Sequence, residues 1–570
     1  MKPACSFGSI LFLIVISVVS SQAGASKEPV RARKGMVVSS HHLASAAGVE
    51  ILKKGGNAVD AAIATGFALA VVLPSAGNLG GGGFMIVHTA MGEITAFDFR
   101  ETAPAAAHEH MYLNQQGRYS EPINHEGYLA IGVPGTVAGL YLAHERFGRL
   151  PMKNLIAPAI KLAQDGFAVS WNLHDEFATL EETFRLYPAS AKAFLKEGER
   201  VYEPGEVWKQ PDLARTLKRI QKSGRDEFYR GETGRLLAAD MRKNGGLITE
   251  QDLAVYQARE RQPIQGTYRG FDIYSMPPPS SGGVALAEML NILEGFDLRA
   301  ASHNSALHLH LLAEAMRRAY ADRARYLGDP EFNPDMPIAK LISKEYASEL
   351  ARKISLNRVS ESDPAAFNEP YESAETTHYS VIDAEGNAVV VTYTLEDWYG
   401  AKIVAEGTGF LLNNEMGDFN PEPGRTDSTG MIGTAPNIVA PGKRMLSSMT
   451  PTIVAKDGKP FLLIGSPGGR TIINTVLQAI VNVIDFDMDI AEALAAPRIH
   501  HQWLPNVLRL EQFGVSPDTQ RLLEMFGHRV RVSSSSRSQG RAMGILVDPK
   551  TSLRHGSADP RAPDGAAIGY

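Results

Sequence analysis

A Thr-Thr-His-Tyr-Ser run, Thr376 to Ser380, begins a predicted strand in the middle of this chain. A threonine hydroxyl is a weak nucleophile at neutral pH and needs a base within hydrogen-bonding distance. If the chain were cut directly before Thr376, the new α-amine, which titrates at about pH 8, would supply that base. Thr376 would then be nucleophile and base together. By itself, however, the run is more typical of an ordinary strand, because threonine is a common β-former.

Three other segments carry groups that suit a pocket for an amino acid. Arg100 follows a predicted hairpin and offers a fork of N–H donors to a carboxylate, while Asp418 in a polar loop offers an anion to an ammonium group. Gly468 and Gly469 can turn their backbone N–H groups toward a developing oxyanion. Taken singly, such residues are typical of surface ion pairs, polar loops and turns. Only their combination predicts a site.

Hairpins must position these groups. Alternating patterns predict hairpins over 84–99, 379–394 and 452–464. Arg100, Thr376 and the Gly468–Gly469 pair lie at or near the ends of these hairpins. Helices are expected over 43–54, over 57–72 and through most of 135–360, where only a rigid Pro-Ser-Gly turn interrupts them. This pattern predicts an α+β fold with layered sheets and outer helices. If the hairpins pack in adjacent sheets, their ends can converge on one cleft.

Composition and charge narrow the class of protein. The chain has 570 residues, 44% of them hydrophobic, and a formal net charge of −6, which argues against nucleic acid as a partner. Residues 1–25 combine Lys2, an apolar run and a small-residue cleavage site, as in a signal peptide. An uncleaved anchor is the alternative. We expect a periplasmic or secreted protein whose only cysteine, Cys5, is removed with the signal.

The order of seven motifs closely resembles γ-glutamyltranspeptidase from about residue 35 to the C-terminus. These motifs are DFRETAP (98–104), GVPGTVAGL (132–140), PPSSGG (278–283), TTHYSV (376–381), LLNNEMGDF (411–419), LSSMTPT (446–452) and GSPGG (465–469).

The resemblance implies an N-terminal-nucleophile hydrolase fold of four αββα layers, made as a proenzyme that needs no metal or cofactor. Self-cleavage between Glu375 and Thr376 would give a large chain, 26–375, and a small chain, 376–570, which stay together as a heterodimer. Thr376 would then attack the γ-amide of glutathione or another γ-glutamyl compound. Water, an amino acid or a peptide would resolve the resulting ester.

The resemblance also assigns residue roles. Thr376 is matched to the nucleophile, Thr394 to a second threonine that positions it, and Gly468 and Gly469 to the oxyanion hole.

In the substrate pocket, Arg100 is matched to the residue that binds the α-carboxylate, assisted by Ser447 and Ser448. Asp418 is matched to the acceptor of the α-ammonium, with Glu415 beside it.

The sequence departs from the family pattern at three places. Glu396 stands near the α-amino position, where many relatives have asparagine. Gly417 replaces an acidic residue, and the segment 420–441, matched to a lid, contains no tyrosine. These departures leave acceptor choice and the ratio of hydrolysis to transfer open.

Two alternatives remain. An acylase of the same fold that cleaves glutaryl or β-lactam side-chain amides would not need an ammonium acceptor, so Asp418 and Glu415 count against it. A non-catalytic relative would bind amino-acid-like ligands as one uncut chain, and the retained Thr376 and glycine pair argue against it.

Overall fold

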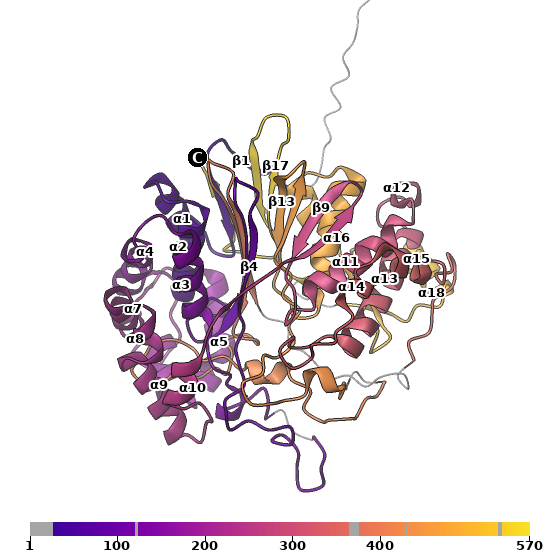
Figure 1. Cartoon of the computed structure of the whole chain (residues 1–570). Coiled ribbons are helices and arrows are strands. Elements are labelled where there is room, and N and C mark those ends of the chain that lie inside the picture. Colours follow the sequence, from indigo (N-terminus) through magenta and orange to yellow (C-terminus); the bar gives the residue numbers. More distant parts are fainter. Residues whose placement is uncertain (1–26, 120–122, 364–375, 429–430, 534–538) are drawn as a thin grey trace, which may run out of the picture.

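The computed structural model describes residues 27–119, 123–363, 376–428, 431–533 and 539–570. Two seven-stranded sheets stack face to face at the centre, and helices cover the outer face of each sheet (Figure 1). This arrangement confirms the predicted α+β class and the four αββα layers. The predicted signal peptide, 1–25, and Glu375 lie outside the described residues.

Near the centre of one sheet lies β10 (Thr377–Ile382), the strand that directly follows the candidate nucleophile Thr376. The order of this sheet is β19 (Ala566–Gly569), β2 (Met36–Ser39), β10, β11 (Ala388–Thr394), β3 (Gly82–His88), β4 (Ile94–Phe99) and β7 (Arg259–Arg261).

The second sheet packs against the first through β10, β11, β13 and β17. Its order is β1 (Val30–Ala32), β18 (Arg554–Ala558), β17 (Met543–Val547), β13 (Lys459–Gly465), β12 (Thr452–Lys456), β9 (Phe271–Ser275) and β8 (Ile264–Tyr268). Both sheets therefore combine strands from before and after residue 376. Shared sheets would hold two chains together after a cut at that point, although the cut itself stays a prediction.

The outer helical layer on the first sheet is made by α1, α2 and α3, with further helices behind them. The bounds are α1 (His42–Lys53), α2 (Ala58–Val72), α3 (Thr136–Phe147), α4 (Met152–Asp165), α5 (Trp171–Arg185), α6 (Pro188–Phe194), α7 (Pro211–Ser223), α8 (Arg225–Tyr229), α9 (Glu232–Lys243) and α10 (Glu250–Val255).

The second sheet is covered by α11, α16 and α17, and α13 packs against α11. The bounds are α11 (Gly282–Glu294), α12 (Leu298–Ala301), α13 (Ala306–Tyr326), α14 (Ile338–Leu341), α15 (Lys344–Ala351), α16 (Thr471–Phe486), α17 (Ile490–Ala495) and α18 (Pro517–Met525).

The predicted helix over 57–72 forms as α2, with a capped N-terminus. Asn57 caps α2 in a capping box with Asp60, in which each side chain accepts from the other residue's backbone N–H. All fifteen residues of α2 are buried, because its small side chains let α1, α4 and the sheet approach from several sides. The predicted helix over 57–72 is confirmed, and it lies inside the protein.

The section 135–360 is mostly helical, as predicted, but it also contains strands that the prediction did not name. Residues 259–275 form β7 and β8, each at the edge of a sheet, and β9, which lies between β8 and β12. Arg269 and Gly270 both adopt positive φ, which makes the two-residue turn that joins β8 to β9. The alternation of buried and exposed residues in Ile264–Tyr268 is the strand signal that the helical interpretation overlooked.

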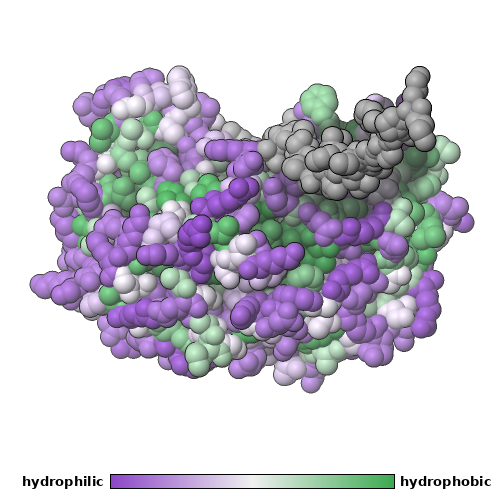
Figure 2. All heavy atoms as spheres, turned by 90° about the horizontal axis from the view of Figure 1, so that it is seen from above, coloured by the Kyte–Doolittle hydropathy of each residue, from purple (hydrophilic) through white to green (hydrophobic). Residues whose placement is uncertain are grey.

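One face of the molecule is mainly hydrophilic (Figure 2). Figure 2 shows one face on which hydrophilic residues cover most of the area, with hydrophobic residues in small groups between them. None of the helices in the described part of the chain has the length and apolar character needed to span a membrane.

Candidate active site

The ends of four neighbouring strands meet at one edge of the first sheet. Thr376 directly precedes β10, and Thr377 pairs with Tyr393, so Thr376 lies beside Thr394 at the end of β11. Thr394 pairs in turn with Gly82 at the start of β3, and Arg100 directly follows β4. The antiparallel register therefore brings the first two predicted hairpins to the same edge, as expected.

The candidate nucleophile is buried and faces a second hydroxyl. The Oγ1 of Thr376 donates to the Oγ1 of Thr394 at 3.4 Å, and the exposed fraction of Thr376 is 7%. The same Thr394 oxygen accepts the backbone N–H of Glu396 at 2.8 Å. Thr394 is thereby held beside the Thr376 hydroxyl.

Gly468 and Gly469 lie in the connection between β13 of the second sheet and α16. Their φ angles are 132° and 53°, a region that glycine adopts without strain. Their carbonyl oxygens accept from the backbone N–H groups of Thr471 and Ile472 in the first turn of α16. The pair therefore sits at a helix N-terminus, where backbone dipoles favour negative charge.

Arg100 is fully buried, and its guanidinium is surrounded by acceptors. Nη1 donates to Glu415 and Nη2 to Asp418, while Nε donates to the carbonyl of Met445 at 3.2 Å. Glu101 lies 3.7 Å from Nη1. Arg100 therefore binds directly to the two acidic residues that were predicted to lie near the substrate ammonium.

Three buried carboxyl groups at or beside the candidate site have raised pKa values. Burial raises the pKa of Glu101 to about 7, although Arg100 acts in the opposite direction. Burial also raises the pKa of Glu415 well above its ordinary value, against the effect of Arg100. The pKa of Glu396 is raised by burial to about 7, with His125 opposing the change. With pKa values of about 7, Glu101 and Glu396 can hold or release a proton near neutral pH.

A second segment brings Ser447 and Ser448 to the site. The backbone N–H of Ser447 donates to the carbonyl of Pro279 at 2.9 Å, and its carbonyl accepts from both the N–H and the hydroxyl of Ser281. Arg323 on α13 donates to the Oγ of Ser448 at 3.1 Å and to the Oγ of Ser281 at 2.9 Å. The Pro-Ser-Gly turn thus positions the serine pair.

Nine of the ten predicted site residues line one small cavity, together with Met449 and Ile472. The nine are Arg100, Thr376, Thr394, Glu396, Glu415, Asp418, Ser447, Ser448 and Gly469. Gly468, the tenth, is the neighbour of Gly469 in the chain. The predicted convergence of the hairpin ends on one cleft is confirmed as geometry.

Sequence reasoning missed three residues that contact this cluster. Arg323 supports Ser448, and Glu101 accompanies Arg100. His125 places Nδ1 3.3 Å from Oε1 of Glu396. Arg323 lies inside a helix rich in arginine, and His125 lies in a loop without a recognisable pattern, so neither carried a signal. Glu101 is part of the DFRETAP motif and could have been found there.

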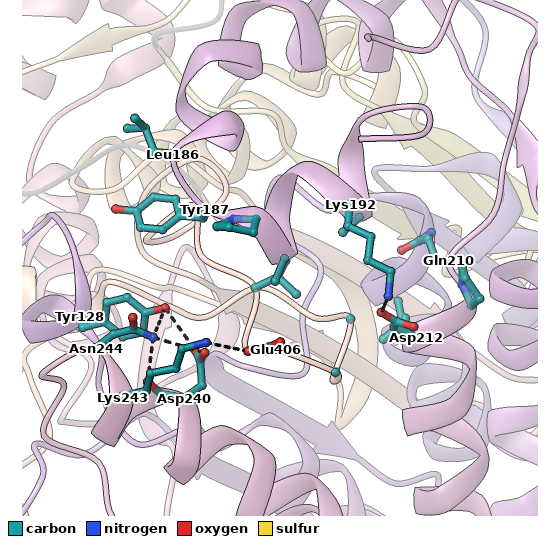
Figure 3. A pocket seen from close by; sticks show the side chains of 18 of the residues that line it. Tyr128, Leu186, Tyr187, Lys192, Gln210, Asp212, Asp240, Lys243, Asn244 and Glu406 are labelled. Atoms are coloured by element: carbon teal, nitrogen blue, oxygen red, sulfur yellow. Dashed lines mark hydrogen bonds and ion pairs between the residues drawn. The ribbon is translucent and has the colours of Figure 1, made fainter. Parts of the chain in front are cut away.

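A larger cavity of about 470 Å³ lies elsewhere and contains none of the predicted site residues. Figure 3 shows its charged side chains paired with one another: Lys243 contacts Glu406 at 2.9 Å, and Lys192 contacts Asp212 at 2.9 Å. Tyr128 donates to Asp240 at 3.0 Å at the same end as Lys243. The first pair joins α9 to the loop around Glu406, and the second joins α6 to α7. The predicted site residues line the smaller cavity instead.

Comparisons with known proteins agree with this geometry. A sequence profile described as gamma-glutamyltranspeptidase matches residues 44–569. The glutathione hydrolase proenzyme of Escherichia coli strain K12 is 50% identical over 546 residues, which cover 95% of this chain and 93% of that protein. The acylase ACY 1 proenzyme of Pseudomonas sp. strain V22 is 40% identical over 549 residues, covering 95% and 94%.

A solved structure extends the comparison to the fold. The crystal structure of a cephalosporin acylase from Bacillus halodurans matches with a TM-score of 0.84 at 28% identity, covering 98% of this chain and 99% of that one. The profile and the relatives both span nearly the whole length. The chain therefore belongs to the γ-glutamyltranspeptidase family and has its N-terminal-nucleophile hydrolase fold.

Proposed function

We propose that this protein is a self-processing γ-glutamyltransferase and glutathione hydrolase in which Thr376 is the nucleophile. The convergence of Thr376, Arg100 and Asp418 on one cavity carries the proposal. The relative from Escherichia coli, which is named as a glutathione hydrolase proenzyme, supports the same activity. Cleavage between Glu375 and Thr376 produces chains 26–375 and 376–570, which remain associated through their shared sheets.

The donor binds through its amino-acid end. Its α-carboxylate accepts hydrogen bonds from the N–H groups of Arg100, with Ser447 and Ser448 as further partners. Its α-ammonium binds Asp418, with Glu415 beside it. Because Arg100 already pairs with Asp418, the zwitterion inserts between them and replaces one ion pair by two. Binding therefore leaves no buried charge without a partner.

The reaction passes through a covalent ester. The Oγ1 of Thr376 attacks the γ-carbonyl carbon, and its proton passes to the α-amine of Thr376. Backbone N–H groups of Gly468 and Gly469 stabilise the oxyanion. The C–N bond then breaks, the amine leaves with the proton, and a γ-glutamyl ester remains. Water, or the amino group of an amino acid or peptide, attacks this ester and regenerates Thr376.

An acylase specific for glutaryl or β-lactam side chains is the second candidate, because two relatives carry acylase names. A glutaryl group lacks the α-ammonium. It would leave Asp418 and Glu415 in the pocket without a cationic substrate partner, which costs binding free energy. The acidic pocket therefore favours γ-glutamyl donors.

Export follows from the sequence of residues 1–25. We propose that these residues are removed and that the mature protein is periplasmic or secreted. Fractionation of cells that express the full chain, followed by N-terminal sequencing of the large chain, tests both parts of this proposal. A large chain that still begins at Met1 would contradict it.

The deciding experiment for the function is intact mass and N-terminal sequencing of the purified wild-type and Thr376→Ala proteins. The wild type should give two chains, one beginning at Thr376, while Thr376→Ala should remain uncut and inactive. Thr377→Ser is the matched control, because it retains a hydroxyl at the neighbouring position, where Thr377 contacts Ser40. A wild-type protein that remains one chain, or Thr376→Ala protein cut at the same bond, would contradict self-processing by Thr376.

A further inference from the structure

Gly417 and His125 occupy complementary space beside the pocket. Gly417 lies between Glu415 and Asp418 in the 3-10 turn η3 (Glu415–Asp418). A Cβ atom added at Gly417 would lie 2.2 Å from Nδ1 of His125 and 2.4 Å from Cε1. Real side chains do not approach so closely, and φ at Gly417 is not positive. The imidazole, rather than the backbone conformation, is what requires glycine at position 417.

Hydrogen bonds hold the His125 segment against η3. The side-chain amide of Asn414 donates to the carbonyl of His125 at 3.0 Å. The amide of Asn124 donates to the carbonyl of Gly417 at 3.4 Å. The His125 side chain is 16% exposed. His125 is therefore held against η3 at its own carbonyl and through the neighbouring side chain of Asn124.

The imidazole contacts the carboxylate of Glu396. Nδ1 lies 3.3 Å from Oε1 and 3.4 Å from Oε2 of Glu396, whose side chain is 2% exposed. Within the described part of the chain, Oε1 makes no hydrogen bond, and Glu396 lines the same cavity as Thr376. Since Glu396 N–H donates to Thr394, the contacts run continuously from His125 to the nucleophile.

Charge explains what the contact does. Besides Glu396, the acids that face His125 are Asp397 beside it in the chain and Asp418 on η3. Burial lowers the pKa of His125, but these carboxylates, Glu396 first, outweigh burial and raise it above its ordinary value. A protonated imidazole in turn favours the ionised form of Glu396, which burial disfavours.

We propose that His125 is a positioning residue for the donor: it fills the space left by Gly417 and holds Glu396 so that Oε1 accepts the donor's α-ammonium together with Asp418. Through Glu396 it sets the preference for γ-glutamyl over glutaryl groups, which lack this ammonium. The inference rests on the proposed function, because it concerns the same pocket and the same donors.

The test compares γ-glutamyl-p-nitroanilide with glutaryl-p-nitroanilide on processed wild-type and His125→Ala enzymes. With the cation removed, Glu396 becomes harder to ionise, so KM for the γ-glutamyl donor should rise about tenfold near pH 7. The acidic limb of kcat/KM should move to higher pH by about one unit. Glutaryl hydrolysis should change less than about twofold, since that substrate makes no ammonium contact. His125→Gln, which restores a neutral donor, should recover KM in part but keep the shifted pH profile.

Gly417→Ala supplies an independent probe. Its methyl group displaces the His125 ring, so the variant should reproduce the selectivity loss of His125→Ala. The double variant should lose no more than either single variant. Gly266→Ala is the matched control, because a Cβ there meets only Ala287 at 3.6 Å and should leave activity unchanged.

The outcomes separate two failures. Processed wild-type enzyme without γ-glutamyl hydrolysis overturns the proposed function and this inference with it. Active wild type with an unchanged donor ratio and pH profile in His125→Ala, or additive losses in the double variant, overturns this inference alone. Two-chain processing of each variant is the check that it has folded.

Discussion

The guanidinium of Arg100 donates directly to the carboxylate of Asp418, and both groups line the cavity that contains Thr376. A cation and an anion that line one cavity side by side are complementary to a zwitterion, whose two charges have the reverse order. The α-carboxylate and α-ammonium of an amino acid provide this order. The ion pair therefore explains how one cavity can select an amino-acid end group while both protein charges remain paired.

Asp418→Asn should reduce kcat/KM for γ-glutamyl-p-nitroanilide by roughly a hundredfold, because a charged hydrogen bond to the ammonium is lost. Glutaryl-p-nitroanilide should be affected much less, so the ratio of the two rates is the informative measurement. Asp165→Asn, which removes an exposed acid that pairs with Lys161 far from the site residues in the chain, is the control. Equal losses on both substrates would refute the assignment of Asp418 to the ammonium.

Arg323→Lys should weaken donor binding without preventing processing. The shorter ammonium cannot donate to Ser448 and Ser281 at the same time, so the serine pair loses support. We expect a drop of about tenfold in kcat/KM, mainly through KM, in steady-state assays. Arg325→Lys, at an exposed position of the same helix, should behave as wild type. Unchanged kinetics in Arg323→Lys would show that the contact to Ser448 does not matter for binding.

Gly468→Ala should impair the oxyanion site. Alanine is strained at φ 132°, and its Cβ would lie 2.4 Å from the Oγ1 of Thr471, so the N–H groups of the turn must move. We expect kcat to fall by about a hundredfold or more, because one misplaced oxyanion donor has an effect of this size. Gly458→Ala, at another positive φ with open space around it, controls for strain alone. Similar kcat values for the two variants would argue against an oxyanion role.

Glu396 should make the protein less stable as pH rises. Its folded pKa is raised by burial to about 7 from an ordinary value of 4.5, so the folded state binds more protons than the unfolded state between these values. Its contribution is therefore fully favourable below pH 4.5 and is lost as pH rises through about 7. The uncut Thr376→Ala chain is the suitable background, because it unfolds as one polypeptide.

Urea unfolding at about pH 5 and about pH 8 measures this effect. In both chains we compare the free energy of unfolding at the two pH values. The decrease from about pH 5 to about pH 8 should be larger in the parent chain, which retains Glu396, than in the Glu396→Gln chain, by on the order of 2 kcal/mol. Glu109→Gln, a change at an exposed acid, should follow the parent chain. Parallel pH profiles for the parent chain and the Glu396→Gln chain would contradict a raised pKa.

Local sequence signals were sufficient for much of the fold. The small buried residues of α2 and its Asn57 cap, the alternation in the three hairpins and the ordered motifs all depend on short stretches of chain. The same motifs identified the family and the candidate residues. Residues 259–275 show where this reasoning fell short. Their strands and positive-φ turn lie within a section that was predicted as mostly helical, and the prediction did not name them.

Only the tertiary structure decided which distant residues touch. The pairing of β11 with β3 brings Thr394 beside Gly82, and from there the site extends to Arg100 after β4. His125 and Gly417 show most clearly what the sequence cannot predict. No sequence pattern links the two positions, yet the His125 ring fills the space that a side chain at position 417 would occupy. Sequence by itself determined the local elements and the family, because these depend on short patterns. Contacts between segments depend on how the sheets stack, and no single segment encodes that.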